Sequence, residues 1–232
     1  MFYYLGVDLG GGSNTWAVAL KEEEKVLFVE KALSLKGENP EPCSFEEIFE
    51  FARKHSVLVS AIDAPLSYSL TLKKGLRSAD LALKGLLPKE YRNWVLSYHA
   101  LMGIPLRGLL FAQKLSPYCG AIIETHPRAS LYFLLPEEKK YLSYKYKKSS
   151  LDEGEIEYLK FLFKEFFSLK LLSSHFHKAD LLDAILCALT AYLYLKMPEK
   201  LLFLPKKEKD LTGYGPFVII EPSFSLKNKK KN

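Results

Sequence analysis

The sequence predicts an α/β protein whose mixed sheet has three antiparallel strands followed by parallel strands, with helices flanking the sheet. Three closely spaced strand patterns, in residues 3–8, 15–20 and 26–33, predict an antiparallel meander. A helix pattern in residues 44–55 then leads to a buried strand in residues 56–63. Because this helix forms a crossover, the fourth strand can lie parallel to the first.

Local signals support each of these elements. The first strand ends at Asp8, and the glycines after it predict a tight turn over residues 10–14. In the crossover helix, Ser44 with Glu47 three positions later has the pattern of a capping box. The fourth strand is an apolar run that ends at Asp63. We therefore expect Asp8 and Asp63 to be neighbours at one edge of the sheet.

The rest of the chain predicts an insertion, a fifth strand and two long helices. Residues 67–117 contain interrupted helix patterns, and we expect them to form a helical insertion that acts as a lid. A fifth strand pattern ends at Glu124. Helix patterns follow in residues 155–170 and 177–195, and residues 215–220 form either a further strand or an ordered tail.

Length and composition predict one folded domain in a reducing compartment. With 232 residues, 48% of them hydrophobic, the chain can bury a sizeable core. We expect residues 1–226 to form this domain and the basic residues 227–232 to form a disordered tail. Three widely separated cysteines support neither a disulfide framework nor a zinc site. We find no signal peptide and no membrane-spanning stretch, so we expect a cytoplasmic protein.

The net charge is weaker evidence about the function of the protein. The formal net charge of +6 permits binding to nucleic acid but is also typical of an ordinary solvated surface. Lys and Glu are abundant and Gln113 is the only glutamine, a bias associated with proteins from hot environments.

The acidic residues form the most informative pattern. Asp180 and Asp183 are three positions apart, so they share one face of a helix that is otherwise apolar. Each acid alone leaves a structural role open, since Asp8 could cap the glycine turn and the helix acids could favour the helix dipole. Considered together, five acids come from three strand ends and one helix: Asp8, Asp63, Glu124, Asp180 and Asp183.

Such a group of carboxylates predicts a metal site. Clustered carboxylates repel one another unless divalent cations lie among them. Oxygen ligands alone favour Mg²⁺ or Mn²⁺ over zinc. Two such ions about 4 Å apart can activate a water, orient a phosphate and stabilise the leaving oxygen. The chemistry expected of this site is therefore phosphodiester hydrolysis.

The segments GVDLG, AIDAP and ADLLDAILCA, in this order of strands and helix, resemble the ribonuclease H-like superfamily of metal-dependent nucleases and resolvases. The segment HKADLLDAILCALTA is similar to the acidic last helix of bacterial Holliday-junction resolvases. Over residues 6–192, the segments VDLGGGSNTWAVA, IDAPLS, RSAD, ETHPRAS and DLLDAILCALTAY resemble the predicted RNase H-like nuclease family known as domain of unknown function four-two-nine.

This resemblance implies a fold, an activity and a set of site residues. It implies an RNase H-like nuclease that depends on Mg²⁺ or Mn²⁺ and acts on DNA or RNA. In this chain the metal carboxylates would be Asp8, Asp63 and Asp183, with Glu124 and Asp180 as further catalytic members. Resolvases act as dimers, so a homodimer is a further expectation.

Basic and aromatic residues supply candidates for substrate binding. Arg77, Asp80 and His126 match motif positions of the family, and Arg77 either holds a phosphate or forms a salt bridge with Asp80. The candidates for substrate binding are Arg77, His126, Lys73 and Lys74. A role for Glu221 stays open. A wider basic rim for nucleic acid would contain Lys73, Lys74, Arg77, Arg107, Lys145, Lys147 and Lys148.

Two other functions stay open at this level. The chain could be a nucleic-acid-binding module that has the RNase H-like fold without catalysis. The glycine hairpin after Asp8 is also similar to the phosphate-binding hairpins of sugar kinases and actin-like ATPases. That architecture needs a second phosphate loop, which the sequence does not show.

Overall fold

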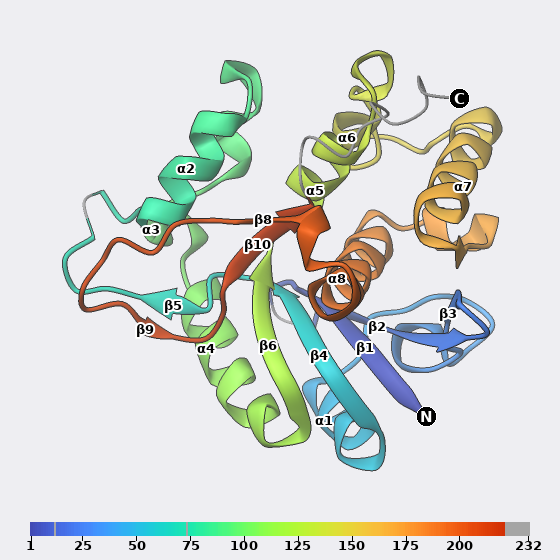
Figure 1. Ribbon diagram of the computed structural model, residues 1–232, viewed down its shortest axis with the longest axis horizontal. Coiled ribbons are helices and arrows are strands. Elements are labelled where there is room, and N and C mark those ends of the chain that lie inside the picture. The colour runs from blue at the N-terminus through green and yellow to red at the C-terminus, as the bar shows by residue number, and fades with distance from the viewer. Residues whose placement is uncertain (12, 73, 221–232) are drawn as a thin grey trace.

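The computed structural model describes residues 1–11, 13–72 and 74–220, and its centre is an eight-stranded mixed sheet (Figure 1). The strand order across the sheet is β7-β3-β2-β1-β4-β6-β10-β8. Its strands are β1 (Phe2–Leu9), β2 (Thr15–Glu23), β3 (Val26–Val29), β4 (Ser56–Asp63), β6 (Cys119–Thr125), β7 (Leu169–Lys170), β8 (Leu201–Phe203) and β10 (Phe217–Ile220). A separate small sheet pairs β5 (Ser67–Tyr68) with β9 (Thr212–Gly213).

The strand directions confirm the predicted mixed sheet. Strands β1, β2 and β3 form the antiparallel meander, and β4 lies parallel to β1. Strands β6 and β10 continue the parallel part, and residues 215–220 therefore contribute a strand. Strand β8 closes this side antiparallel to β10, and β7 pairs in parallel with β3 on the other side.

Helices cover both faces of the sheet (Figure 1). Helices α1 and α4 pack with the apolar core on one face, and α5, α6, α7 and α8 pack with the core on the other. The helices are α1 (Phe45–Lys54), α2 (Ser78–Leu86), α3 (Tyr98–Leu101), α4 (Ile104–Leu115), α5 (Pro127–Leu134), α6 (Leu142–Lys145), α7 (Glu153–Phe167) and α8 (Ala179–Lys196). Within the described part of the chain, none of these helices combines the length and hydropathy needed to span a bilayer.

Two predicted elements end earlier than expected. The third strand stops at Val29, and Leu33 takes a left-handed φ of 54° at the start of a 3₁₀ turn, η1 (Leu33–Leu35). Helix α7 stops at Phe167 because Ser168 adopts a left-handed conformation, and the next two residues form β7 instead. The capping box at the start of α1 is confirmed, since the side chains of Ser44 and Glu47 each bind the other's backbone N–H.

The insertion between β4 and β6 contains short elements. It begins with β5 and α2, continues through a 3₁₀ segment, η2 (Lys89–Trp94), and ends with α3 and α4. A third apolar core joins α2 and η2 to α5 and β10, so the insertion packs against the end of the sheet. Lys73, Glu221 and the tail at 227–232 lie outside the described residues.

Helix α8 lies unusually close to β1, and Gly6 makes this possible. A Cβ atom at Gly6 would lie 2.1 Å from the carbonyl oxygen of Ala184 and 2.2 Å from the amide nitrogen of Ala188. Only a residue without a side chain fits such a backbone approach. Gly6 therefore sets the distance between the first strand and the acidic helix.

Candidate metal centre

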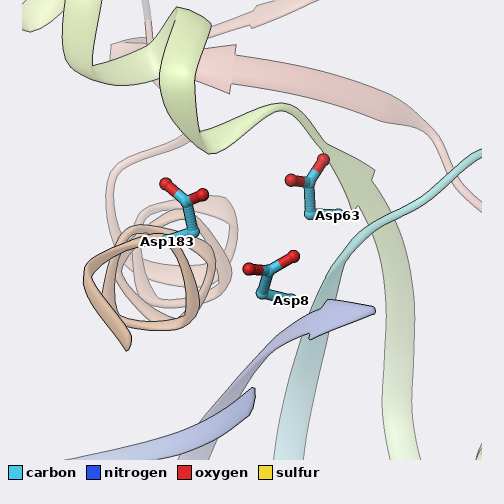
Figure 2. A group of neighbouring side chains, drawn as sticks. All are labelled: Asp8, Asp63 and Asp183. Atoms are coloured by element: carbon cyan, nitrogen blue, oxygen red, sulfur yellow. The ribbon is translucent and has the colours of Figure 1, made fainter. Parts of the chain in front are cut away.

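Three carboxylates converge at the carboxyl ends of β1 and β4 (Figure 2). In the parallel pairing of these strands, Asp8 lies directly opposite Asp63, so both side chains project from the same face. Asp183 reaches the same place from the first part of α8. One carboxylate oxygen from each residue lies within 4.8 Å of the others, which confirms the predicted convergence of these three acids.

The carboxylates of this triad perturb one another. Burial is the main cause that raises the pKa of Asp8 well above its usual range, and the charges of Asp183 and Asp63 add to it. Burial and the charge of Asp183 raise the pKa of Asp63 to about 8. Burial also raises the pKa of Asp183, although the Lys147 ammonium and the Tyr146 hydroxyl act to lower it. The arrangement therefore favours a proton or a cation among the three groups.

Two residues from the connection after α6 hold Asp183 in place. The Tyr146 hydroxyl donates a hydrogen bond of 2.6 Å to Oδ1 of Asp183. The Lys147 ammonium forms an ion pair with Asp183 and another of 2.8 Å with Asp180. Burial opposes the charged form of Lys147, but these carboxylates outweigh it and raise its pKa.

Asp180 lies beside the triad and is held by its own partners. The Asn14 side-chain amide donates to Asp180 at 3.0 Å, and the Trp16 indole N–H donates to the Asn14 carbonyl at 2.9 Å. Burial would raise the pKa of Asp180, but the hydrogen bonds from Lys147 and Asn14 lower it overall. Asp180 thus stays ionised and shares Lys147 with Asp183.

Glu124 does not join the triad, although it ends the neighbouring strand. In the pairing of β4 with β6, Glu124 lies opposite Ile62, one position before Asp63. Because side chains alternate along a strand, Glu124 projects from the opposite face of the sheet. There it pairs with Arg77 through two contacts, one of them 2.7 Å long, and accepts a hydrogen bond of 2.9 Å from the Leu66 amide.

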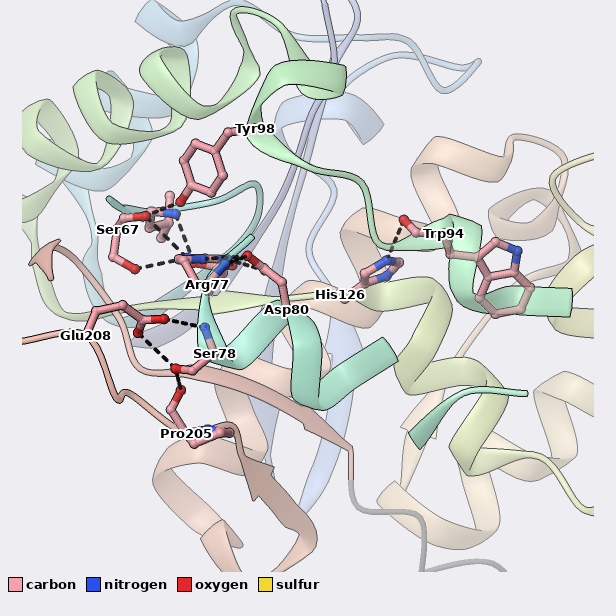
Figure 3. A network of polar contacts seen from close by, with 11 residues as sticks. Ser67, Arg77, Ser78, Asp80, Trp94, Tyr98, His126, Pro205 and Glu208 are labelled. Carbon is pink, nitrogen blue, oxygen red and sulfur yellow. Dashed lines mark hydrogen bonds and ion pairs between the residues drawn. The ribbon is translucent and has the colours of Figure 1, made fainter. Parts of the chain in front are cut away.

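Arg77 is the centre of a buried ionic cluster (Figure 3). Its side chain is 2% exposed and pairs with both Asp80 and Glu124, so the predicted Arg77–Asp80 salt bridge is confirmed. The Asp80 carboxylate also accepts from the backbone N–H of Arg77. Arg77 therefore connects the insertion to the sheet, and its charge is satisfied within the protein.

His126 caps a helix and faces the insertion. Its Nδ1 accepts a hydrogen bond from the Ala129 amide at 3.4 Å, and its Nε2 donates to the Trp94 carbonyl at 3.3 Å (Figure 3). Burial lowers the pKa of His126 to about 4, which keeps the imidazole neutral. Both ring nitrogens are thus used by the protein.

Most of the expected basic rim makes contacts within the chain. The Arg107 guanidinium donates to the Gly10 carbonyl at 2.6 Å, and Lys145 pairs with Glu155 at 2.7 Å. Lys147 points inward to the acids, while Lys74 and Lys148 are exposed. Fewer residues of the basic rim are therefore available to bind nucleic acid than the sequence predicts.

Three contributions to the site were not predicted from the sequence: the roles of Asn14 and Tyr146, and the inward direction of Lys147. The segment YKYKK offers a partial signal, because alternating aromatic and basic residues would place tyrosines and lysines on different sides of an extended chain. The segment is instead helical and turn-like, which brings Tyr146 and Lys147 to the same acid. The roles of Tyr146 and Lys147 therefore become visible only in their tertiary contacts with α8.

The donor set of the triad fits a hard divalent cation. Asp8, Asp63 and Asp183 offer carboxylate oxygens, which are the ligands that Mg²⁺ and Mn²⁺ prefer. Burial raises the pKa of each of these groups, so their ionised forms would gain from a bound cation. Comparison of the chain with protein-family models, curated proteins and solved structures finds no match.

Proposed function

We propose that this protein is a divalent-metal-dependent nuclease with an RNase H-like fold, which hydrolyses phosphodiester bonds of nucleic acid with water as the nucleophile. The observation that carries this proposal is the convergence of Asp8, Asp63 and Asp183 within 4.8 Å at the carboxyl ends of two parallel strands. Clefts at the carboxyl ends of strands are where α/β proteins usually bind their ligands. The sheet order and the acidic last helix agree with the superfamily that the sequence resembles.

Asp8, Asp63 and Asp183 would hold Mg²⁺ or Mn²⁺. The bound ion supplies Lewis acidity, which polarises a phosphoryl oxygen and lowers the pKa of water. Asp8 and Asp63 must lose their protons to bind the ion, so their raised pKa values couple metal binding to pH. Both oxygens of Asp183 already have partners, Oδ1 the Tyr146 hydroxyl and Oδ2 the Lys147 ammonium, so a bound ion would share Asp183 with these groups.

The remaining polar groups have supporting roles in this proposal. Lys147 brings a positive charge to the triad, where it can offset the charge of a substrate phosphate. His126 is neutral and satisfied at both nitrogens, so we assign it no acid or base role. The exposed Lys74 and Lys148 and the net charge of +6 support a nucleic acid as substrate, either DNA or RNA.

One observation favours a second candidate function. The ion pairs of Lys147 with Asp180 and Asp183 supply a cation to the acids from the protein itself. A module that binds nucleic acid without cleaving it could keep its acids balanced in this way. The two functions differ in metal binding, since only the nuclease needs a divalent ion at the triad.

The deciding experiment combines metal binding with cleavage. The parent protein is titrated with Mn²⁺ by calorimetry and assayed on single-stranded, duplex and branched DNA and RNA with Mg²⁺ or Mn²⁺. The Asp8→Asn variant should lose more than about a hundredfold in activity, because even changes around metal ligands cost about 10–100-fold. The matched control is Asp152→Asn, an exposed helix N-cap at which Asn is equally suitable.

Three results would count against the proposal. A parent that binds no Mn²⁺ and cleaves none of the substrates supports the non-catalytic module. A cleaving parent that is unaffected by Asp8→Asn shows that the chemistry lies elsewhere. If Asp8→Asn fails to fold while Asp152→Asn folds, Asp8 has a structural role at the opening turn.

A further inference from the structure

A cavity of about 240 Å³ adjoins the triad at the end of the sheet. Asp8 and Asp63 line one side of it, and the end of β6 contributes Thr125 and His126. Pockets for drug-sized ligands have volumes of about 300–1,000 Å³, so this cavity suits a smaller group. Because Asp8 and Asp63 belong to both the triad and the cavity wall, the cavity offers space for a group bonded to a phosphate at the triad.

The walls of the cavity are largely apolar. The insertion contributes Val95, Leu96 and Ile104, and β10 contributes Phe217. Trp94 lies at the same border, where the Arg128 guanidinium stacks on its ring at 4.0 Å. Apolar and aromatic walls favour a flat, neutral group over a strongly hydrated one.

Among the described residues, Thr125 is the cavity-lining residue that has a fully buried side-chain atom without a hydrogen-bond partner. Its side chain is 2% exposed, and its hydroxyl has no hydrogen-bond partner among the described residues. Because Glu124 lies opposite Ile62, the next residue, Thr125, projects from the same face as Asp63. A buried hydroxyl without a partner costs stability, and a ligand that hydrogen-bonds to it would remove this cost.

The charges around the cavity exclude a second phosphate as its occupant. Arg77 lines the cavity, but Asp80 and Glu124 already pair with it. These three residues together carry a net negative charge, which disfavours an anion at that end. The occupant should therefore be neutral, with a hydrogen-bonding group for Thr125.

We infer that the cavity binds one unpaired nucleoside next to the phosphate held at the triad. This inference rests on the proposed nuclease function and adds its substrate class, a nucleotide that has left the base stack. A base pair does not fit a cavity of this size, and removing a base from a duplex costs a few kcal/mol in stacking and pairing. The unpaired nucleoside is supplied either by a strand end or by an unpaired position within a strand.

The first test measures binding separately from turnover. Adenosine 5′-monophosphate, adenosine 3′-monophosphate and inorganic phosphate are titrated into the protein with Mg²⁺ by calorimetry. At least one mononucleotide should bind about tenfold more tightly than phosphate. If phosphate binds and neither mononucleotide binds more tightly, the inference is wrong and the proposed function stands. If Mg²⁺ itself does not bind, the proposed function fails first.

The second test is a set of threonine variants. Thr125→Val should weaken mononucleotide binding about five- to tenfold, the usual effect of one hydrogen bond, without changing phosphate binding. Thr125→Ser keeps the hydroxyl and should retain the affinity. The matched control is Thr15→Val, because Thr15 is also 2% exposed with an unpartnered hydroxyl but does not line this cavity. Equal effects of the two valine variants would contradict the inference.

The third test separates the two sources of the nucleoside. Cleavage is mapped on a single strand, a blunt duplex and a duplex with one bulged nucleotide. Products released only from ends identify the strand end as the source, and a cut beside the bulge identifies an internal unpaired nucleotide. Uniform cutting along the paired parts of the duplex would overturn the inference.

Discussion

Two groups of buried or half-buried carboxylates lie at the same end of the sheet, on opposite faces, and they differ in whether a cation pairs with each carboxylate. On one face, Glu124 and Asp80 share the Arg77 guanidinium, with short hydrogen bonds to each carboxylate. On the other face, Asp8 and Asp63 lie directly side by side. Within the described residues, the triad's ion pair joins Asp183 to Lys147. Each carboxylate of the first cluster pairs with the guanidinium, whereas Asp8 and Asp63 have no ion pair among the described residues.

This difference separates a structural cluster from a candidate binding site. A cluster in which every carboxylate pairs with a guanidinium holds elements together, and removing a carboxylate leaves buried donors without their charged acceptor. Carboxylates that lie together without a paired cation cost stability in the free protein, and a bound cation restores this stability. Equivalent substitutions in the two clusters should therefore change stability in opposite directions.

The largest expected effect is on the Arg77 cluster. Glu124→Gln should lower the free energy of unfolding by about 1.5–3 kcal/mol, because it removes the charged acceptor of two buried hydrogen bonds from Arg77, which stays paired with Asp80. In the triad, Asp63→Asn should leave the metal-free protein equally stable or more stable, because it relieves repulsion with Asp8. Urea denaturation with a chelator present measures both variants.

A suitable control is Glu157→Gln, which removes an exposed ion pair with Lys160. Such pairs contribute less than about 1 kcal/mol, so this variant should unfold close to the parent. The comparison fails if Asp63→Asn destabilises the metal-free protein as much as Glu124→Gln does. In that case both clusters are structural.

The two clusters also show what the sequence could and could not predict. The ends of β1 and β4 were predictable from apolar runs that stop at an acid, and a crossover helix between them implied parallel neighbours. The same reasoning failed for Glu124, because a strand end does not reveal the register with the next strand. One position in register decides which face a side chain occupies.

Other parts of the site depend on contacts between distant segments. The segment that carries Tyr146 and Lys147 has no pattern that points it toward α8, and both residues meet Asp183 only in the folded chain. The insertion was predicted as helical, but its short 3₁₀ and helical turns lack the repeats that define boundaries. The resulting cavity could not be predicted without the fold.

The next prediction concerns the distance between β1 and α8. Gly6→Ala should displace α8, since the new methyl group would overlap the backbone at Ala184 and Ala188. We expect the free energy of unfolding to fall by about 1–3 kcal/mol or more, as for other overpacked cores. Because Asp183 moves with the helix, Mn²⁺ affinity should also decrease, which calorimetry on the folded variant measures.

The matched control for this change is Gly85→Ala in α2. A Cβ atom at Gly85 meets no atom within 4 Å, and alanine favours a helix by about 0.5–1 kcal/mol. This variant should be at least as stable as the parent and bind Mn²⁺ equally well. A Gly6→Ala variant with parental metal affinity would show that the triad does not depend on the close approach of α8.

The smallest expected effect is the pH dependence of the metal-free protein. Burial and the charge of Asp183 raise the pKa of Asp63 to about 8, against an ordinary value of 3.8. Between these two values the folded protein binds more protons than the unfolded chain, so the free energy of unfolding should fall as the pH rises from about 4 to about 8. A divalent cation replaces the protons, and its stabilising effect should grow over the same range. Melting curves at each pH, with a chelator or with Mg²⁺, measure both trends. Asp63→Asn should weaken the metal-free trend, because Asp63 no longer titrates while Asp8, whose pKa burial also raises, still does. If the metal-free parent instead becomes more stable toward pH 8, or if Mg²⁺ stabilises it equally at every pH, the triad carries no excess charge and the contrast between the two clusters disappears.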